Sequence, residues 1–182
     1  MLWLVVSIDR MTLGFYYHLP IVVKESGLYV FSSLGVFIDS LASEVEFLYL
    51  LMHEAKPESN EAKEADYRLK ASNLTWVSLG IKTPAWHRAI FHRKLLSYGI
   101  RQIEHCDYLI VRSPSPLAPY FHLYAKQVKV VFMVVGDYGE ALRHAKPKGM
   151  REWVMWKYIG YNNRIFVRTM RHSNVVVNSP EL

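Results

Sequence analysis

Short apolar runs, rich in β-branched and aromatic residues, are separated along the chain by polar stretches and by segments with helical spacing. Each run has the length of a strand, and the runs are Leu2–Ile8, Phe15–Val23, Val45–Leu51, Tyr67–Leu69, Leu74–Leu79, Asp107–Val111, Val128–Val135 and Val175–Val177. Runs without regular alternation of polar residues are typical of strands that are buried on both faces of a parallel sheet.

Four segments between these runs predict helices. Ser32 or Ser33 would cap the first, and Thr83-Pro84 starts the second in the favoured order of a capping residue and a proline. The second helix would extend to about Glu104 and bury one side, which is made of Trp86, Ile90, Leu95, Ile100 and Ile103. The other two segments are Leu117–Gln127 and Gly149–His172.

The alternation of strands and helices predicts an α/β fold. Its crossover connections imply a parallel sheet with helices on both faces, in a single domain that spans residues 1–182. The polar stretch His53–Ala65 predicts an exposed loop. Ligands of such folds bind at the carboxyl ends of the strands. The loops expected at that edge are Asp9–Gly14, Arg112–Pro116, Gly136–Glu140 and Asn178–Pro180.

The composition fits one folded domain. The 182 residues are 51% hydrophobic and 21% charged, which is enough apolar surface for a core and excludes intrinsic disorder. The single cysteine, Cys106, excludes an internal disulfide and cysteine-rich zinc sites, and it favours a cytoplasmic location. No base lies near Cys106 in the sequence, so we expect a buried thiol rather than a nucleophile.

No segment is long enough to cross a membrane as a helix. The longest runs without Asp, Glu, Lys or Arg have 13 residues, as in Met11–Val23 and Ser26–Ile38, whereas a spanning helix needs about 20 apolar residues. The first ten residues, MLWLVVSIDR, have no basic residue before their apolar run. We therefore expect a strand there rather than a signal peptide.

The formal charge of +6 is unevenly distributed along the chain. Residues 1–86 contain 7 Lys and Arg against 10 Asp and Glu, whereas residues 87–182 contain 15 against 6. Such asymmetry indicates an anionic partner, or else a basic face that is simply solvated.

Several common catalytic motifs are absent from the sequence. It contains no glycine-rich dinucleotide or triphosphate loop, no G-x-S-x-G nucleophile motif and no D-x-D pair. His87 and His92 are five residues apart, whereas zinc-binding pairs on a helix are usually four apart, so we expect no metal there. We expect no cofactor either, and a small Rossmann-like methyltransferase is disfavoured because its glycine-rich loop is missing.

Three segments together resemble the amino-terminal domain of GT-B glycosyltransferases, in particular the family 4-like group that contains sugar transferases of polysaccharide and lipopolysaccharide biosynthesis. The segments are DYLIVRSPSPLAPYF, KVVFMVVGDYGEALR and RTMRHSNVVVNSPEL. The earlier GLYVFSSLGVFIDSLA resembles the segment in which these domains place a glycine-containing loop before their first long helix. The resemblance covers nearly the whole chain.

The resemblance implies a Rossmann-like domain that forms one half of a metal-independent, hexosyltransferase-like enzyme. In this family the amino-terminal domain receives the acceptor, and a carboxyl-terminal domain binds the nucleotide-sugar donor through paired glutamates. The sequence up to Leu182 shows no second domain that could carry this motif. We therefore expect a fragment of a longer protein, or a protein that needs a partner chain, and we expect it to be inactive alone.

Asp137 is the catalytic candidate that the resemblance implies. A carboxylate after a buried strand could deprotonate or orient the acceptor hydroxyl, although Gly136-Asp137 could equally be a turn in which the aspartate caps the next helix. Related enzymes often have histidine near the position of Gly136. The implied substrate-binding residues are Asp9, Arg10, Gly14, Arg112, Ser113, Gly136, Tyr138, Asn178 and Ser179. Ordinary turn chemistry explains the Ser and Asn residues equally well.

The predicted helix Gly149–His172 gathers several of the positive charges on one of its sides. One side of it carries apolar residues, and the opposite side carries Lys157, Arg164, Arg168 and Arg171. Such a face could lie on an anionic membrane surface, which suits a lipid-linked acceptor and a peripheral position on the inner face of the plasma membrane. The alternative is a helix with a core side and a solvated side.

Two functions from different classes follow. The first is an acceptor-binding domain that takes a glycan or lipid-linked acceptor. The second is a non-catalytic basic module that binds a membrane surface or nucleic acid, and nucleic acid is disfavoured because no binding motif of defined spacing is present.

Overall fold

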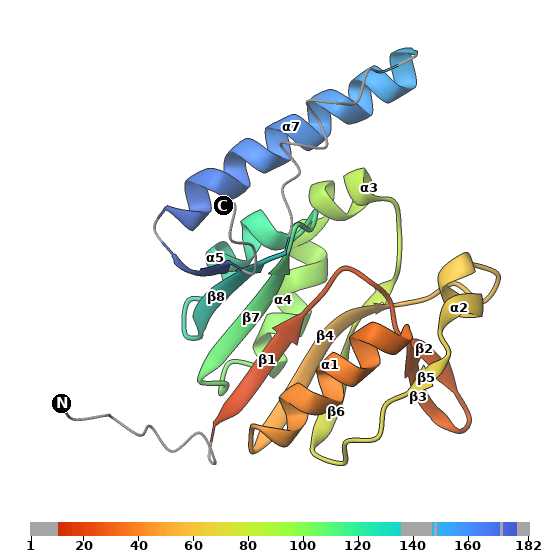
Figure 1. Ribbon diagram of the computed structural model, residues 1–182. Coiled ribbons are helices and arrows are strands. Elements are labelled where there is room, and N and C mark those ends of the chain that lie inside the picture. Colours follow the sequence, from red (N-terminus) through yellow and green to blue (C-terminus); the bar gives the residue numbers. More distant parts are fainter. Residues whose placement is uncertain (1–10, 136–146, 148, 172, 178–182) are drawn as a thin grey trace.

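A six-stranded parallel sheet forms the centre of the molecule. The computed structural model describes residues 11–135, 147, 149–171 and 173–177. The strands of this sheet are β1 (Thr12–Tyr16), β4 (Phe47–Glu54), β6 (Leu74–Ile81), β7 (Tyr108–Ser113), β8 (Lys129–Val134) and β9 (Asn174–Val177). They lie in the order β6-β4-β1-β7-β8-β9, and all neighbours are parallel (Figure 1). The predicted parallel sheet is confirmed.

The strand order makes β1 the centre of the sheet. The chain leaves β1 for β4 and β6 on one side, then returns to place β7, β8 and β9 on the other. In doubly wound sheets of this kind, the two halves diverge above the point where the order reverses, and ligands bind in the crevice at the carboxyl ends of the strands. Here that switch point lies between β1 and β7.

Helices cover both faces of the sheet, as the sequence predicts. Helix α1 (Ser32–Ser43) packs on one face, with Leu13 and Phe15 of β1 in its core. The other face is covered by α4 (His92–Gln102), η2 (Ala118–Tyr120), α5 (Phe121–Tyr124) and α7 (Met150–Met170). Tyr16 points into this second core. Neighbouring residues of β1 therefore pack on opposite faces of the sheet, because side chains alternate along a strand.

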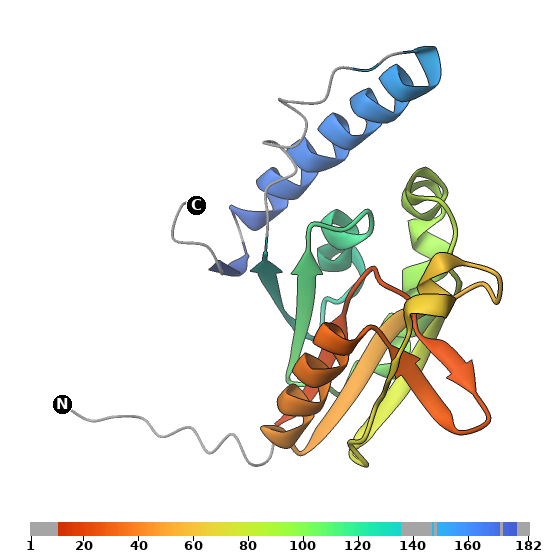
Figure 2. The same ribbon diagram turned by 45° about the vertical axis from the view of Figure 1, so that its right-hand side comes forward.

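Helix α7 lies on the side of the sheet toward which the strand arrows point, in both Figure 1 and Figure 2. Phe166 anchors it edge-on to Phe132 of β8, with 5.4 Å between the ring centroids. The Tyr158 hydroxyl donates to the carbonyl of Ala85, 3.3 Å away, just where α3 (Ala85–Ile90) begins. The helix thus borders the carboxyl edge of the sheet.

A small antiparallel sheet lies beside the main sheet, and two of its three strands come from the segment between β1 and α1. It contains β2 (Val22–Lys24), β3 (Gly27–Val30) and β5 (Tyr67–Arg68). The prediction of one strand over Phe15–Val23 is wrong, because the chain leaves the main sheet after Tyr16 and Pro20 lacks the N–H that a ladder needs. The residues GLYV, which begin the segment that resembles the family's glycine-containing loop, form β3.

The predicted helix Thr83–Glu104 is two helices. It breaks at Phe91, where φ is −95° and ψ is 20°, and α4 follows. Trp86 and Ile90 are 45% and 64% exposed, so their predicted burial is wrong, whereas Ile100 and Ile103 are buried as expected.

Other predicted elements differ at their ends. Phe31, not a serine, is the N-cap of α1, because the Ser32 N–H and hydroxyl donate to Asp66 at 3.0 and 2.7 Å. The predicted loop His53–Ala65 begins inside β4 and contains α2 (Asn60–Glu64). Leu117–Gln127 forms only the short η2 and α5. The predicted strand Leu2–Ile8 lies outside the described residues.

Within the described residues, no helix combines the length and apolarity needed to span a membrane.

Candidate functional site

Basic and imidazole side chains gather at the carboxyl edge of the sheet. His18 follows β1, His53 lies near the end of β4, Lys82 follows β6, and Arg112 is the penultimate residue of β7. Because parallel strands end at the same edge, these side chains come together. Arg88 reaches the same place from α3, and its Nη1 donates to the carbonyl oxygen of His18 over 3.5 Å.

Among the described residues, Arg88 is a buried cation without a countercharge. It is 4% exposed, and its Nε has no hydrogen-bond partner in the part of the chain that the structure describes. The only ion pair among the described residues joins Lys82 to Glu61. Burying an unpaired guanidinium costs several kcal/mol of folding free energy. A structural role alone therefore does not account for this arginine.

The two histidines of the edge are held in the neutral form. Burial, and then the positive charge of Arg88, lower the pKa of both His18 and His53 to about 4. The Nδ1 of His53 lies 3.2 Å from the carbonyl oxygen of Gly80, so it carries the proton and leaves Nε2 as an acceptor. Among the described residues, this Nε2 and the Nδ1 of His18 are buried without hydrogen-bond partners. Buried polar atoms without partners require an explanation.

Arg112 lies above two aromatic rings at the end of β7. Its guanidinium carbon is 4.5 Å from the ring centroid of Tyr17 and 5.6 Å from that of Phe37. Its Nε is buried and has no partner. Stacking fixes the plane of the guanidinium and leaves its N–H groups free to bind a carboxylate or phosphate.

A buried hydrogen bond joins the chain at the ends of β1 and β7, at the switch point. The hydroxyls of Tyr16, at the end of β1, and Ser115, after β7, are 2.6 Å apart and buried. The ring of Tyr16 also contacts that of Phe121, with centroids 4.5 Å apart. The loops after β1 and β7 therefore start from a rigid base.

The predicted site residues fall into four groups, of which Gly14 and Ser113 are the last. Arg112 lies at the predicted edge. The second group, which lies outside the described residues, is Asp9, Arg10, Gly136, Asp137, Tyr138, Asn178 and Ser179. The third group is exposed on α7 and consists of Lys157, Arg164, Arg168 and Arg171, and its role as a membrane or anion face stays a prediction.

Gly14 and Ser113 do not lie in the loops predicted for them. Gly14 is inside β1, and a Cβ at this position would come within 3.0 Å of Leu109 Cδ1 and 3.2 Å of Ile103 Cδ1. It is a packing glycine, so its prediction as part of a rim loop is wrong. Ser113 is fully buried in β7, and its hydroxyl donates to the carbonyl of Val111 at 3.5 Å, which leaves it unable to contact a ligand in this conformation.

Sequence analysis missed His18, His53, Lys82 and Arg88. His53 and Lys82 follow apolar runs within three residues, so the rule that ligands bind at the carboxyl ends of strands could have found them. His18 lies inside the run Phe15–Val23, so the pattern does not place it at a strand end. Arg88 gives no such signal, because it lies within a helix and reaches the edge only through the packing of α3.

Other reactive groups do not extend this site. Burial raises the pKa of the Cys106 thiol to about 12, in keeping with the predicted buried thiol. The described residues contain no group of three or more His, Cys, Asp or Glu side chains that could hold a metal ion. No known protein-family model matches the chain, and no curated protein sequence matches it significantly.

Proposed function

We propose that this chain is the acceptor-binding domain of a GT-B-type glycosyltransferase. The observation that carries the proposal is a set of basic and imidazole groups at the carboxyl edge of a parallel sheet. Among the described residues, His18, His53, Arg88 and Arg112 each have a buried nitrogen atom without a hydrogen-bond partner. A sugar acceptor offers hydroxyl and anionic groups, and the buried Nε2 of His53, the stacked Arg112 and the buried Arg88 are complementary to them. The sequence resemblance supplies the family.

In the proposed reaction, an acceptor hydroxyl bound at this edge attacks the anomeric carbon of a nucleotide-sugar. The new bond joins the acceptor oxygen to that carbon, and the bond from the carbon to the nucleotide phosphate breaks. The proton of the hydroxyl passes to a base, for which Asp137 remains the sequence candidate. The donor would be held by a second domain, so the chain provides acceptor binding and orientation.

This division of labour can be tested by titration of the chain. We expect N-acetylglucosamine linked to farnesyl diphosphate, a soluble mimic of a lipid-linked acceptor, to shift the amide NMR signals of the loops after β1, β4, β6 and β7. UDP-glucose and GDP-mannose should bind no tighter than about millimolar. Arg112→Gln should weaken mimic binding roughly 10-fold, the scale of one charge-assisted hydrogen bond.

Arg101→Gln is the matched control, because Arg101 is exposed on α4 and its loss removes the same charge. Micromolar binding of either nucleotide-sugar to the chain alone, or no binding of the mimic, would contradict the proposal.

A second candidate is a module that binds an anionic membrane surface without catalysis. One observation favours it. An exposed stripe runs along α7 and changes from apolar and aromatic to basic, through Met150, Trp153, Val154, Lys157, Tyr161, Arg164, Arg168 and Arg171. Such a combination is typical of helices that lie in the membrane interface. The same surface would also suit an acceptor domain whose acceptor is in a membrane.

A further inference from the structure

A pocket of about 330 Å³ opens beside the candidate site, between the ends of β4 and β6, helix α2 and the start of α3. It is lined by Ala55, Lys56, Ser59, Glu61, Lys82, Thr83, Pro84, Ala85 and Arg88. The apolar residues of this lining are two alanines and a proline, and the other six residues are charged or carry a hydroxyl group. The pocket can therefore bind a charged group together with a few neighbouring carbon atoms.

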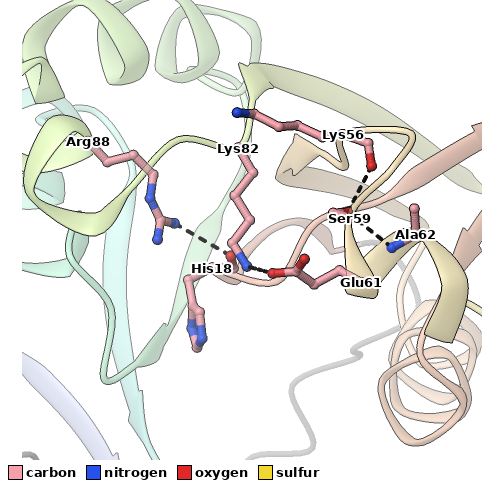
Figure 3. Close-up of polar contacts among 7 residues, drawn as sticks. All are labelled: His18, Lys56, Ser59, Glu61, Ala62, Lys82 and Arg88. Carbon is pink, nitrogen blue, oxygen red and sulfur yellow. Dashed lines mark hydrogen bonds and ion pairs between the residues drawn. The ribbon is translucent and has the colours of Figure 1, made fainter.

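The lining has an excess of positive charge. Three cations, Lys56, Lys82 and Arg88, face one carboxylate, Glu61. Glu61 accepts a hydrogen bond from Lys82 over 2.7 Å (Figure 3), and this bond lowers the pKa of the carboxyl. With that pair satisfied, Lys56 and Arg88 have no carboxylate partner among the described residues.

Arg88 forms the buried end of the pocket. Figure 3 shows its guanidinium turned toward the backbone of His18, on the side where the Lys82 ammonium lies. In the described part of the chain, the guanidinium makes one long hydrogen bond of 3.5 Å, and its Nε has no partner. A buried polar group without a partner requires an explanation, and the planar fork of an arginine matches the oxygens of a phosphate.

The hydroxyl groups of the lining are already used. Ser59 Oγ accepts from the N–H of Ala62 at 3.2 Å and donates to the carbonyl of Lys56 at 2.8 Å. Thr83 Oγ1 lies 3.1 Å from Nδ1 of His87. The groups left for a ligand are the cations, which selects an anion over a neutral sugar.

We infer that this pocket binds a phosphoryl group, with Arg88 at its buried end and Lys82 and Lys56 toward solvent. Two unmatched positive charges suit a dianion. The volume lies at the lower end of the range for small-molecule sites, so it accommodates a phosphoryl group with its neighbouring sugar or lipid carbon atoms, and not a whole dinucleotide.

The inference deepens the proposed function, on which it rests for one point: if the ligand is the sugar acceptor, the acceptor carries a phosphate. The pocket itself is argued from charge, burial and volume alone.

Isothermal titration calorimetry with four probes tests it: inorganic pyrophosphate, inorganic phosphate, glucose 1-phosphate and farnesyl phosphate, with sodium acetate as the reference anion at matched ionic strength. We expect saturable binding of phosphoryl probes and none of acetate. Tighter binding of farnesyl phosphate than of glucose 1-phosphate assigns the phosphoryl group to a lipid carrier, and the reverse order assigns it to a soluble sugar phosphate.

Arg88→Met is the decisive variant. It should weaken pyrophosphate binding at least 10-fold while its melting temperature without ligand stays at or above that of the wild type, because an unpaired buried charge is removed. Arg93→Met, on the exposed side of α4, should bind as the wild type does. Lys56→Gln changes an exposed residue at the mouth and should weaken binding about 3-fold without affecting the fold.

No saturable binding of any phosphoryl probe by the wild type, or equal losses in Arg88→Met and Arg93→Met, would overturn the inference. Failure here is distinguishable from failure of the proposed function. If no phosphoryl probe binds while the farnesyl-linked sugar binds and Arg112→Gln weakens that binding, the pocket is not a phosphoryl site but the acceptor proposal stands. If the phosphoryl probes bind through Arg88 and the farnesyl-linked sugar does not bind, the pocket stands and the acceptor proposal falls.

Discussion

At the scale of single residues, the two edge histidines couple the stability of the fold to pH. His18 and His53 have a pKa of about 4 in the folded chain, against 6.5 for an unperturbed histidine, through burial and through Arg88. Between these values the unfolded chain binds more protons than the folded one. The free energy of unfolding must then rise with pH across this window, and stability is lost as the pH falls from 6.5 toward 4.

We expect this loss to reach about 3 kcal/mol for each histidine, at roughly 1.4 kcal/mol per unit of pKa. Urea unfolding between pH 4 and 8 measures it. The double substitution His18→Gln and His53→Gln should flatten the slope between pH 5 and 6.5, whereas His122→Gln, at an exposed position, should leave it unchanged. A slope that the double substitution does not change would rule out this origin.

How far single residues could be predicted depends on what places them. Arg112 can be predicted from the sequence because it directly follows an apolar run. His53 is not indicated in the same way, because the apolar run before it ends at Leu51, two residues earlier. Burial of His53 follows from the extra length of β4, which extends to Glu54. Sequence patterns define strand ends poorly, and here the site lies at strand ends.

At the scale of elements, helix α1 depends on a glycine that no sequence motif indicates. A Cβ at Gly35 would overlap the ring of Tyr67. That ring cannot move freely, because its hydroxyl donates to Asp39 at 2.9 Å, and Asp39 also accepts from the N–H groups of Lys70 and Ala71. The close contact between α1 and β5 is thus fixed from both sides.

Gly35→Ala should therefore destabilise the protein by about 1 to 3 kcal/mol, the usual cost of overpacking. Gly160→Ala makes the same chemical change in α7, where no heavy atom lies within 4 Å of the added carbon, and it should stabilise by roughly 0.5 to 1 kcal/mol through helix propensity. Chemical unfolding of the two variants compares them directly. Equal effects would show that α1 can shift to accept a side chain.

Helix α7 is the element on which the membrane hypothesis can be tested. Replacing Arg164, Arg168 and Arg171 by Gln should weaken binding to phosphatidylglycerol-containing vesicles about 100-fold, at about 1 kcal/mol for each basic residue near an anionic surface. Vesicle co-sedimentation measures this. Binding should also fall as salt is added, because the charges on the exposed stripe are screened.

The matched control removes three exposed charges from the other half of the chain, Lys63, Arg68 and Lys70. It should bind vesicles as the wild type does. Equal weakening in both triple variants would mean that net charge alone, rather than the α7 stripe, attracts the chain to the vesicles.

The elements also show what periodicity can and cannot predict. It predicted the sheet strands from β4 onward and the long helix α7, because a long apolar or amphipathic segment is compatible with only one kind of secondary structure. It failed at the hairpin of β2 and β3 and at the break at Phe91. Each of these depends on contacts made with residues distant in sequence, such as the pairing of Tyr29 with Arg68.

At the scale of the whole molecule, the charge asymmetry along the chain does not correspond to the candidate site. His18, His53 and Lys82 come from the acidic first half of the sequence, and Arg88 and Arg112 from the basic second half. The fold brings both halves to one edge. Composition therefore predicts an anionic partner without locating the candidate site, because the fold draws the side chains of the site from both halves of the chain.

The α/β class and the parallel sheet could be predicted because they depend on the alternation of strand and helix, which is local information. The strand order could not, because nothing in the pattern says on which side of β1 each later strand will pair. The pocket beneath Arg88 depends on that order together with the position of α3. It becomes visible only when the whole sheet is assembled.

The central position of β1 has a consequence for biosynthesis. β1 precedes both of its partners in the chain, and its neighbour β7 and the Ser115 hydroxyl, 99 residues after Tyr16, are translated much later. At 5 to 20 residues per second, a ribosome takes roughly 5 to 20 s to reach them. During that time the nascent chain presents one unpaired edge of its most buried strand, which is the surface that chaperones bind.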